Sequence, residues 1–222
     1  MVMKVNIQKP KFLDDLEEVE DIIEEIIEAD KIQNKIVENI VIENMISKGV
    51  TIDSCIFKNV VFENSSLRNI DLLDTRFENC DLSNVDLGDG SIHRVEFINC
   101  KLLGAKLDEC NIKDVAFRDS LGKYINLSYS KLKNVCIEDC NFKESIFQQV
   151  KFDKVNFNNT DLTASYFNKT SLNKVDLTTC DITEIDVEIS DLSGAIVTSI
   201  QGLDLTRLMN IVIIIFIKNK TV

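Results

Sequence analysis

A five-residue period runs through most of the chain and constrains its fold more than any other feature. Every fifth residue from Ile52 to Val197 is Leu, Phe, Ile or Val at 29 of 30 positions, and Gly122 is the one exception. Ten of the twelve phenylalanines in the chain fall in this register. Such self-similarity predicts a repeat architecture in which each unit is buried only by its neighbours.

A second register lies two residues earlier, at the positions divisible by five, and it holds mostly small or β-branched residues. A polar residue separates the two registers, as Asp81 and Asn126 do. Inward, outward, inward over three residues is the alternation of a short strand, and the remaining two residues then turn a corner. We therefore expect residues 36–205 to form an all-β solenoid.

A weaker 20-residue period predicts four sides per turn, about eight turns, and columns of identical side chains in the interior. Right-handed winding follows from the usual crossover preference. The predicted core ladder consists of Phe57, Phe77, Phe97, Phe117 and Phe157 in one column and Cys80, Cys100, Cys140 and Cys180 in another.

Pentads such as Cys80-Asp81-Leu82-Ser83-Asn84 resemble the motif of the pentapeptide-repeat proteins, which is roughly Ala-(Asp/Asn)-Leu-X-X. The resemblance covers residues 38–205 and implies a right-handed quadrilateral β-helix. One departure is the first position, where Val, Cys, Ser and Thr outnumber Ala. Among the family's members, the Qnr type protects DNA gyrase and topoisomerase IV, so the resemblance implies a type II topoisomerase as one candidate partner.

The segment before the repeats, residues 1–35, is expected to cap the first turn. Residues 12–27 place Phe12, Leu16, Val19 and other apolar residues on one stripe, with an acidic opposite face, which predicts an amphipathic helix. A cap is expected because an open solenoid end exposes unpaired backbone and core. The alternative is a separate helix that binds a partner.

The segment after the repeats, residues 206–222, contains an apolar run that is an aggregation hazard if it stays bare. We expect a second subunit to bury it in a two-fold dimer. The alternative is that the strand folds back over the last turn. The run consists of Ile211, Val212, Ile213, Ile214, Ile215, Phe216 and Ile217.

The sequence predicts no enzyme activity, no cofactor and no metal. Six of the seven cysteines occupy the inward register, where a free thiol is a small apolar filler. Cys136 lies one residue out of register, so we expect it to face solvent and react most readily. His93, the sole histidine, is predicted to point outward, without the nucleophile and orienting partner of a catalytic triad.

Two places interrupt the registers, at Gly88–Gly90 and at Leu121–Gly122. We expect a β-bulge at each, because one displaced residue kinks a ladder in this way. The alternative is a contact point where the regular surface changes shape.

The formal net charge of −12 argues against direct binding of nucleic acid or an anionic membrane. Met1–Pro10 has no apolar segment typical of a secretory signal, and the apolar run is too short for a spanning helix. A cytoplasmic location is the expectation.

One side of the predicted solenoid, centred on Ile112, Leu132, Phe152 and Leu172, carries seven basic residues against six acidic ones, whereas the other three sides are net acidic. We therefore expect a non-enzymatic scaffold that presents flat, rigid faces to an unknown protein partner. The alternative is a Qnr-like, DNA-mimicking binder of gyrase or topoisomerase IV. The predicted basic face consists of Arg94, Lys113, Lys131, Lys133, Lys151, Lys154 and Lys174.

Overall fold

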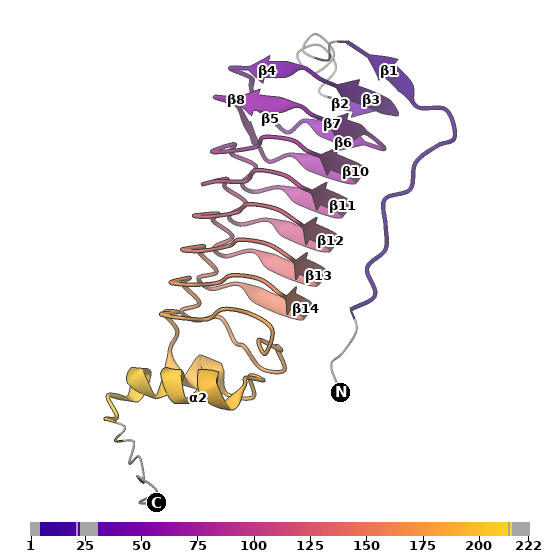
Figure 1. Ribbon diagram of the computed structural model, residues 1–222. Coiled ribbons are helices and arrows are strands. Elements are labelled where there is room, and N and C mark those ends of the chain that lie inside the picture. Colours follow the sequence, from indigo (N-terminus) through magenta and orange to yellow (C-terminus); the bar gives the residue numbers. More distant parts are fainter. Residues whose placement is uncertain (1–4, 21, 23–30, 213, 215–222) are drawn as a thin grey trace, which may run out of the picture.

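The computed structural model describes residues 5–20, 22, 31–212 and 214 (Figure 1). The chain winds into a parallel β-solenoid of about seven turns, slightly fewer than the eight expected. Residues that pair on neighbouring turns are 20 apart in the chain, as Phe77 and Phe97 are. This spacing confirms the predicted 20-residue period.

Each turn has four sides, which we name A to D in chain order after the strands of one early turn. These are β6 (Thr51–Asp53) on side A, β7 (Ile56–Lys58) on side B, β8 (Val61–Glu63) on side C and β9 (Ser66–Arg68) on side D. The turn before it contains β2 (Lys31–Gln33), β3 (Lys35–Glu38), β4 (Val41–Glu43) and β5 (Ile46–Lys48).

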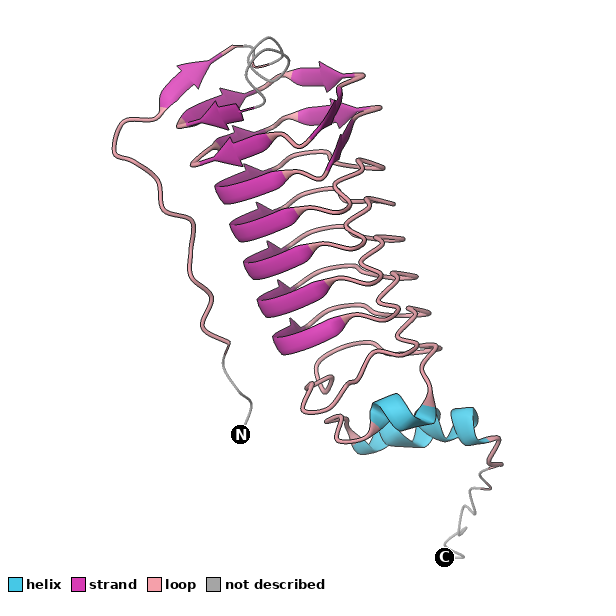
Figure 2. Ribbon diagram, turned by 180° about the vertical axis from the view of Figure 1, so that it is seen from behind, coloured by secondary structure: helices cyan, strands magenta, loops and turns pink. Residues whose placement is uncertain are grey.

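Further along the solenoid the two halves of each turn differ. Sides A and B join into one eight-residue strand per turn, while sides C and D pair through isolated bridges such as Asp81 with Lys101 (Figure 2). The long strands are β10 (Asp71–Glu78), β11 (Ser91–Ile98), β12 (Asn111–Arg118), β13 (Lys131–Glu138) and β14 (Lys151–Asn158).

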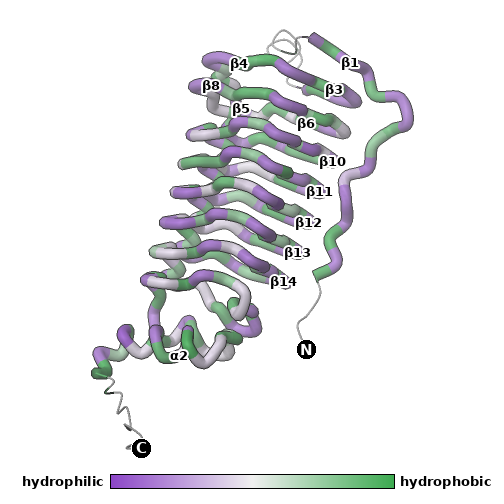
Figure 3. The backbone as a smooth tube through the Cα atoms, in the orientation of Figure 1, coloured by the Kyte–Doolittle hydropathy of each residue, from purple (hydrophilic) through white to green (hydrophobic). Residues whose placement is uncertain are grey.

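The interior is a continuous stack of apolar side chains, and apolar and polar residues alternate around the turns (Figure 3). The rings of Phe57, Phe77, Phe97 and Phe117 stack in turn, with centroid distances of 4.9, 5.1 and 4.9 Å. Burial of each such side chain contributes about 1.5–3 kcal/mol. The interior is therefore the main source of the solenoid's stability.

The corners of the solenoid use a left-handed backbone conformation. The fourth residue after each position divisible by five has a positive φ in nearly every pentad, for example 53° at Asn59 and 55° at Asp114. Asn, Asp and Gly enter this region most easily, because their side chains are absent or bond locally to the backbone. This requirement explains why Asn or Asp recurs at 20-residue intervals along one corner, at Asn59, Asn79, Asn99, Asp119 and Asp139.

The expected bulge at Leu121–Gly122 is wrong. Leu121 keeps its bridges to Lys101 and Asn141 on the turns before and after, so the register is continuous. A Cβ atom on Gly122 would lie 2.5 Å from a ring carbon of Phe142. The phenylalanine of the next turn therefore fills the space that this glycine leaves.

The expected bulge at Gly88–Gly90 is also wrong. Ser91, directly after it, pairs with Asn111 in the ordinary register. A Cβ atom on Gly90 would lie 2.8 Å from the carbonyl oxygen of Leu87, so the turn is too tight for a side chain there. Gly88 instead makes room for the guanidinium group of Arg68, which passes where its Cβ would stand.

The predicted N-terminal helix is wrong for every described residue between 12 and 27. Residues 5–16, which we call the strap, run without helix or strand alongside the solenoid from the level of β14 to its first turns (Figure 1). β1 (Glu17–Val19) then pairs in parallel with β3. The physical reason is that this strand covers the open edge of the first turn with backbone hydrogen bonds, such as that from Glu17 N to Asn34 O at 3.0 Å.

The helical cap lies at the other end of the solenoid, in α2 (Ser199–Leu205), followed by the 3-10 helix η2 (Thr206–Met209). Another 3-10 helix, η1 (Ile189–Leu192), precedes α2. Thr198 and Gln201 form a capping box at the start of α2. None of the helices in the described ranges is long and apolar enough to cross a membrane.

Candidate interaction surfaces

Five lysines form a basic patch on side A, made of Lys113, Lys131, Lys133, Lys151 and Lys154. All five are exposed. Lys113 pairs across the sheet with Lys133, and Lys131 pairs with Lys151. Like charges directly opposite each other on neighbouring strands are destabilising. The single ion pair that the described residues make with the patch is Lys133 with Asp153, at 3.2 Å.

Two residues of the predicted basic face lie outside this patch. Arg94 sits at the corner between sides A and B and makes two hydrogen bonds of 2.6 Å to the carboxylate of Asp74. The charge of Arg94 is therefore paired with Asp74 within the protein. Lys174 is exposed at the same corner one turn beyond Lys154 and borders the patch.

The strap is held at the corner between sides A and B by two buried carboxylates. Lys11 N donates to Asp74 Oδ1 at 2.9 Å, and Gln8 N donates to Asp114 Oδ1 at 3.3 Å. The ring of Phe12 lies 5.3 Å from the guanidinium carbon of Arg76. Burial opposes ionisation of Asp74, but hydrogen bonds from Arg94 and Lys11 lower its pKa below the usual value.

Asp114 is the most enclosed of these groups, with no exposed surface. Asn134 Nδ2 donates to Oδ1 at 3.0 Å, while Oδ2 has no hydrogen-bond partner among the described residues. His93 Nε2 lies 3.6 Å from Oδ2. Burial and the neighbouring charges of Arg94 and Lys113 lower the pKa of His93, so its imidazole is neutral at pH 7. His93 is thus half-buried beside the corner, where an outward, solvated side chain was expected.

The strap was not predicted from the sequence, although one residue in it, Pro10, is consistent with an extended backbone. Pro10 cannot sit in a helix interior, which argues for extended backbone around it. The acceptors Asp74 and Asp114 resemble any other corner residue in the sequence, because Asp is common at that position. Only the fold places Asp74 and Asp114 along the same corner, where both accept hydrogen bonds from the strap.

The cysteines are free, and six of them are buried. Burial raises the pKa of the Cys55 and Cys140 thiols to about 11, and that of Cys110 to about 12. Cys136 is half-buried, and burial followed by the charge of Glu138 raises its pKa as well. The described residues contain no group of three or more His, Cys, Asp or Glu side chains that fits a metal ion.

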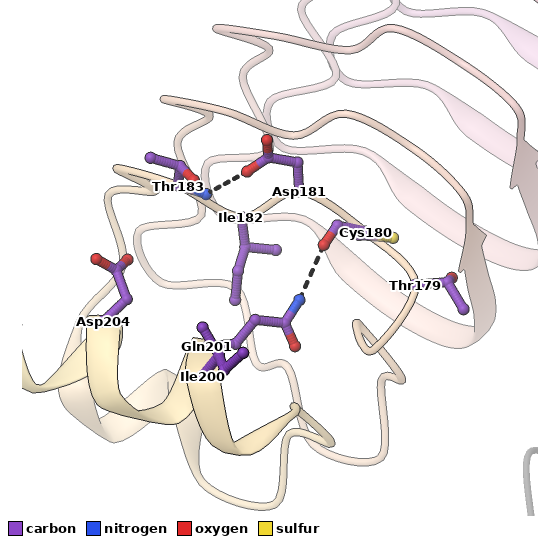
Figure 4. A pocket seen from close by; sticks show the side chains of 8 residues that line it. All are labelled: Thr179, Cys180, Asp181, Ile182, Thr183, Ile200, Gln201 and Asp204. Atoms are coloured by element: carbon purple, nitrogen blue, oxygen red, sulfur yellow. Dashed lines mark hydrogen bonds between the residues drawn. The ribbon is translucent and has the colours of Figure 1, made fainter.

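A shallow cavity of about 320 Å³ lies between the last turn and α2. In Figure 4 the side chain of Gln201 points from the helix toward Cys180. Its amide Nε2 donates to the carbonyl oxygens of Leu177 and Cys180, at 2.9 and 2.8 Å. The side chain of Gln201 therefore links α2 to the last turn and helps to close the end of the solenoid.

The outer face of this C-terminal end is apolar and exposed. Ile200 is 79% exposed and Leu203 56%. In the predicted dimer strand, Ile211, Val212 and Ile214 are also exposed and are not assigned to a strand. Ile213, Ile215, Phe216 and Ile217 lie outside the described residues.

Comparison with known families places repeats over most of the solenoid. Residues 90–143 match a family described as "Pentapeptide repeat region". Residues 55–89 and 145–184 match one described as "Pentapeptide repeats (8 copies)". Together these segments span more than half of the chain. No curated protein matches the sequence significantly.

The solved structures that resemble this chain include pentapeptide repeat proteins, at low sequence identity and with TM-scores below 0.5. A trypsin-treated form of QnrB1, a plasmid-mediated fluoroquinolone resistance protein, is 16% identical, with a TM-score of 0.47 over 80% of this chain and 99% of that one. HetL, involved in heterocyst differentiation regulation in Nostoc sp. strain PCC 7120, is also 16% identical, with a TM-score of 0.27 over 69% and 85% of the two chains. A pentapeptide repeat protein from Cyanothece 51142 is 13% identical, with a TM-score of 0.29 over 79% and 96%.

Proposed function

The chain belongs to the pentapeptide-repeat family, and from that premise we propose that it is a non-enzymatic scaffold whose flat sides bind other proteins. The basic patch on side A is the contact we assign to its main partner, and the partner presents an acidic surface. The long strands β12, β13 and β14 hold the five lysines in a flat array with fixed spacing.

The observation that carries this proposal is the uncompensated charge of the patch. Five exposed lysines face one exposed carboxylate, Asp153, in a chain whose formal net charge is −12. Charged groups that repel each other in the free protein favour a partner that supplies the opposite charge. Such a patch gives orientation and a fast, salt-dependent association rate.

The test is affinity capture from an extract of the source cells, comparing the wild type with a patch variant. The variant replaces Lys113, Lys131, Lys133 and Lys151 with Glu. A control makes the same change at lysines of side C, namely Lys101, Lys123 and Lys143. We expect wild type and control to retain one common protein at 50 mM salt, and the patch variant to lose it.

Two further measurements decide the outcome. Circular dichroism and melting curves check that all three proteins fold alike. Retention should fall steeply between 50 and 200 mM salt, because exposed charges are screened over about 10 Å at 0.1 M ionic strength. If the patch variant retains the same protein as the control, the assignment of side A is wrong.

The acidic sides B, C and D support a second candidate, a Qnr-like binder of DNA gyrase or topoisomerase IV. The test is gyrase supercoiling, with and without ciprofloxacin, as this protein is titrated. Neither inhibition nor protection at micromolar concentration would exclude this candidate. Binding through the basic patch predicts no effect in the same assay.

We also propose that the C-terminal end forms a two-fold dimer. Ile200 and Leu203 expose apolar side chains about one turn apart on α2, and Val212 is exposed beyond the cap. Large exposed apolar surfaces mark association sites. Light scattering should give twice the monomer mass for the wild type and the monomer mass for Ile200→Glu. A monomeric wild type at micromolar concentration would contradict this.

A further inference from the structure

Side D carries a patch without charge in the middle of a strongly acidic protein. From Ile125 to Tyr129 and from Ser145 to Gln149, two successive turns have no charged residue on this side. Between residues 50 and 199, no other side has two successive turns without charge. The exposed or half-buried members of this neutral patch are Asn126, Tyr129, Ile146, Gln148, Gln149 and Tyr166. Tyr124 borders it at the corner between sides C and D, where Lys123 contacts the ring and pairs with Glu144 at 3.0 Å.

All three tyrosines of the chain lie at the neutral patch. They are between 44% and 53% exposed. The hydroxyl groups of Tyr129 and Tyr166 make no hydrogen bond to any residue in the described ranges. Protein interfaces are enriched in tyrosine and depleted of charge at their centres, and Tyr with Asn, Ser and Gln is the composition of adaptable binding surfaces.

Two of these tyrosines occupy unfavourable backbone positions. Tyr124 and Tyr129 stand at consecutive corners, each with φ of 63°. A left-handed conformation costs an ordinary L-residue about 1–2 kcal/mol, whereas Asn and Gly adopt it routinely. Most other corners hold Asn, Asp or Gly, such as Asn84 and Gly104 in the column of Tyr124. Folding alone therefore favours Asn at both positions, and strain of this kind is found at functional sites.

Charged residues of side D border the neutral patch at its two ends along the solenoid, which we call its rims. Their net charge indicates which charge a partner carries there. At one end Asp86, Asp89 and Asp108 share Arg68, and Glu109 is exposed without an ion pair in the described structure. Lys106 is the one further cation there. At the other end Asp186 and Glu188 are exposed, and Lys169 offsets one of these charges. The two rims are four turns apart, which is about 19 Å at one strand spacing per turn.

We propose that the neutral patch binds a protein segment with an uncharged, partly aromatic or aliphatic middle and basic residues at both ends. A helix of about 13 residues spans the distance between the rims. A second copy of this chain does not fit, because both rims are net acidic and repel in either orientation. With the basic patch on the adjacent side A, the scaffold has two surfaces of different chemistry and joins two different partners.

A selection from a displayed library of random 16-residue peptides tests this proposal. The immobilised proteins are the wild type, Tyr124→Asn/Tyr129→Asn and the control Ser54→Asn, which changes a corner residue of positive φ on another edge. We expect the wild type and the control to enrich peptides with Lys or Arg at both ends and an uncharged middle. Enrichment on the double variant should be at least tenfold lower, although Asn suits both corners and the variant should fold.

Tyrosine emission then measures affinity directly, because the chain has no tryptophan and its three tyrosines all lie at the patch. A selected peptide should change the emission in a saturable way. Glu109→Gln/Asp186→Asn/Glu188→Gln should weaken binding about tenfold at low salt and less at 0.5 M salt. The proposal is overturned if no peptide is enriched, if acidic-ended peptides are enriched, or if the double variant selects the same peptides equally well.

Discussion

The two halves of each turn have the same interior and different exteriors. Sides A and B form long strands with charged outer residues, whereas sides C and D turn tightly after three residues. On sides C and D the first outward residue often accepts a hydrogen bond from the backbone two residues on, as Asp81 does from Ser83 N at 3.0 Å. The same arrangement at Asp161 and Thr163 measures 3.1 Å.

The difference shows which residues control which property. Inward positions set the 20-residue turn and are equivalent on all four sides. Outward positions decide whether a side extends as a strand or closes as a turn. Where Asp176 and Thr178 place such a turn on side B, the long strand no longer forms. A change inside the solenoid should therefore affect both halves, and a change outside should stay on its own side.

The largest effect is expected for Phe97→Asp on side B. Phe97 is fully buried and stacks between Phe77 and Phe117. Loss of the ring costs about 3–5 kcal/mol and a buried unpaired carboxylate adds to this, so the free energy of unfolding should fall by more than 4 kcal/mol. Hydrogen exchange should show lost protection on sides C and D too. Loss confined to side B would contradict the shared interior.

The sequence predicts this interior well, because burial acts on every fifth residue and repeats some thirty times. It does not predict the two kinds of side. Asn111, Asn126 and Asn156 each occupy the first outward position of a pentad. Asn111 and Asn156 lie in long strands, whereas Asn126 accepts a hydrogen bond from Ser128 N at a turn. Whether a side forms a strand or a turn depends on the equivalent residues of the neighbouring turns. The sequence of a single pentad does not contain this information. The strap was missed for a similar reason, since its partners Asp114 and Asp74 lie 106 and 63 residues away in the chain.

A smaller effect is expected for Gly122→Leu on side C. Leu would match the neighbouring Leu102 in the column, but its Cβ would meet the ring of Phe142. Overpacking of this kind costs about 1–3 kcal/mol. The double variant Gly122→Leu/Phe142→Ala should be more stable than Phe142→Ala alone, since the leucine fills part of the cavity.

Urea unfolding of the two single variants and the double variant measures this coupling. Additive losses would mean that Gly122 and Phe142 do not share one space. Phe147→Ala, a buried phenylalanine on side D, serves as the control for the loss of a ring.

Acid should weaken the turns of side C through Asp161. Partial burial alone raises its pKa, but hydrogen bonds from the hydroxyl and N–H of Thr163 and from Lys143 lower it below the usual value. The stabilisation is present above the unfolded pKa of about 3.9 and is lost as the pH falls through the lower folded pKa. Asp161→Asn should remove about 1 kcal/mol of this pH-dependent term.

The measurement is the melting temperature between pH 6 and pH 2 for the wild type, Asp161→Asn and the control Asp71→Asn. Asp71 is exposed on side A, and its side chain makes no contact of this kind with the described residues. The melting temperature of Asp161→Asn should fall less between pH 6 and pH 2 than that of the wild type. The melting temperature of the control should fall as much as that of the wild type. A parallel curve for Asp161→Asn would show that the carboxylate does not stabilise the turn.

The smallest effect is a gain in stability from Tyr124→Asn at the corner between sides C and D. Asn relieves the left-handed strain, while the contact between Lys123 and the ring, at 4.6 Å, is lost. The net gain should be between a few tenths and about 1 kcal/mol, since a surface cation–π contact contributes about 0.5–1 kcal/mol. The reverse change in the same column, Asn84→Tyr, should be destabilising by a similar amount. If Tyr124→Asn lowers the free energy of unfolding, the tyrosine serves the fold, and the argument from strain to binding at the neutral patch fails.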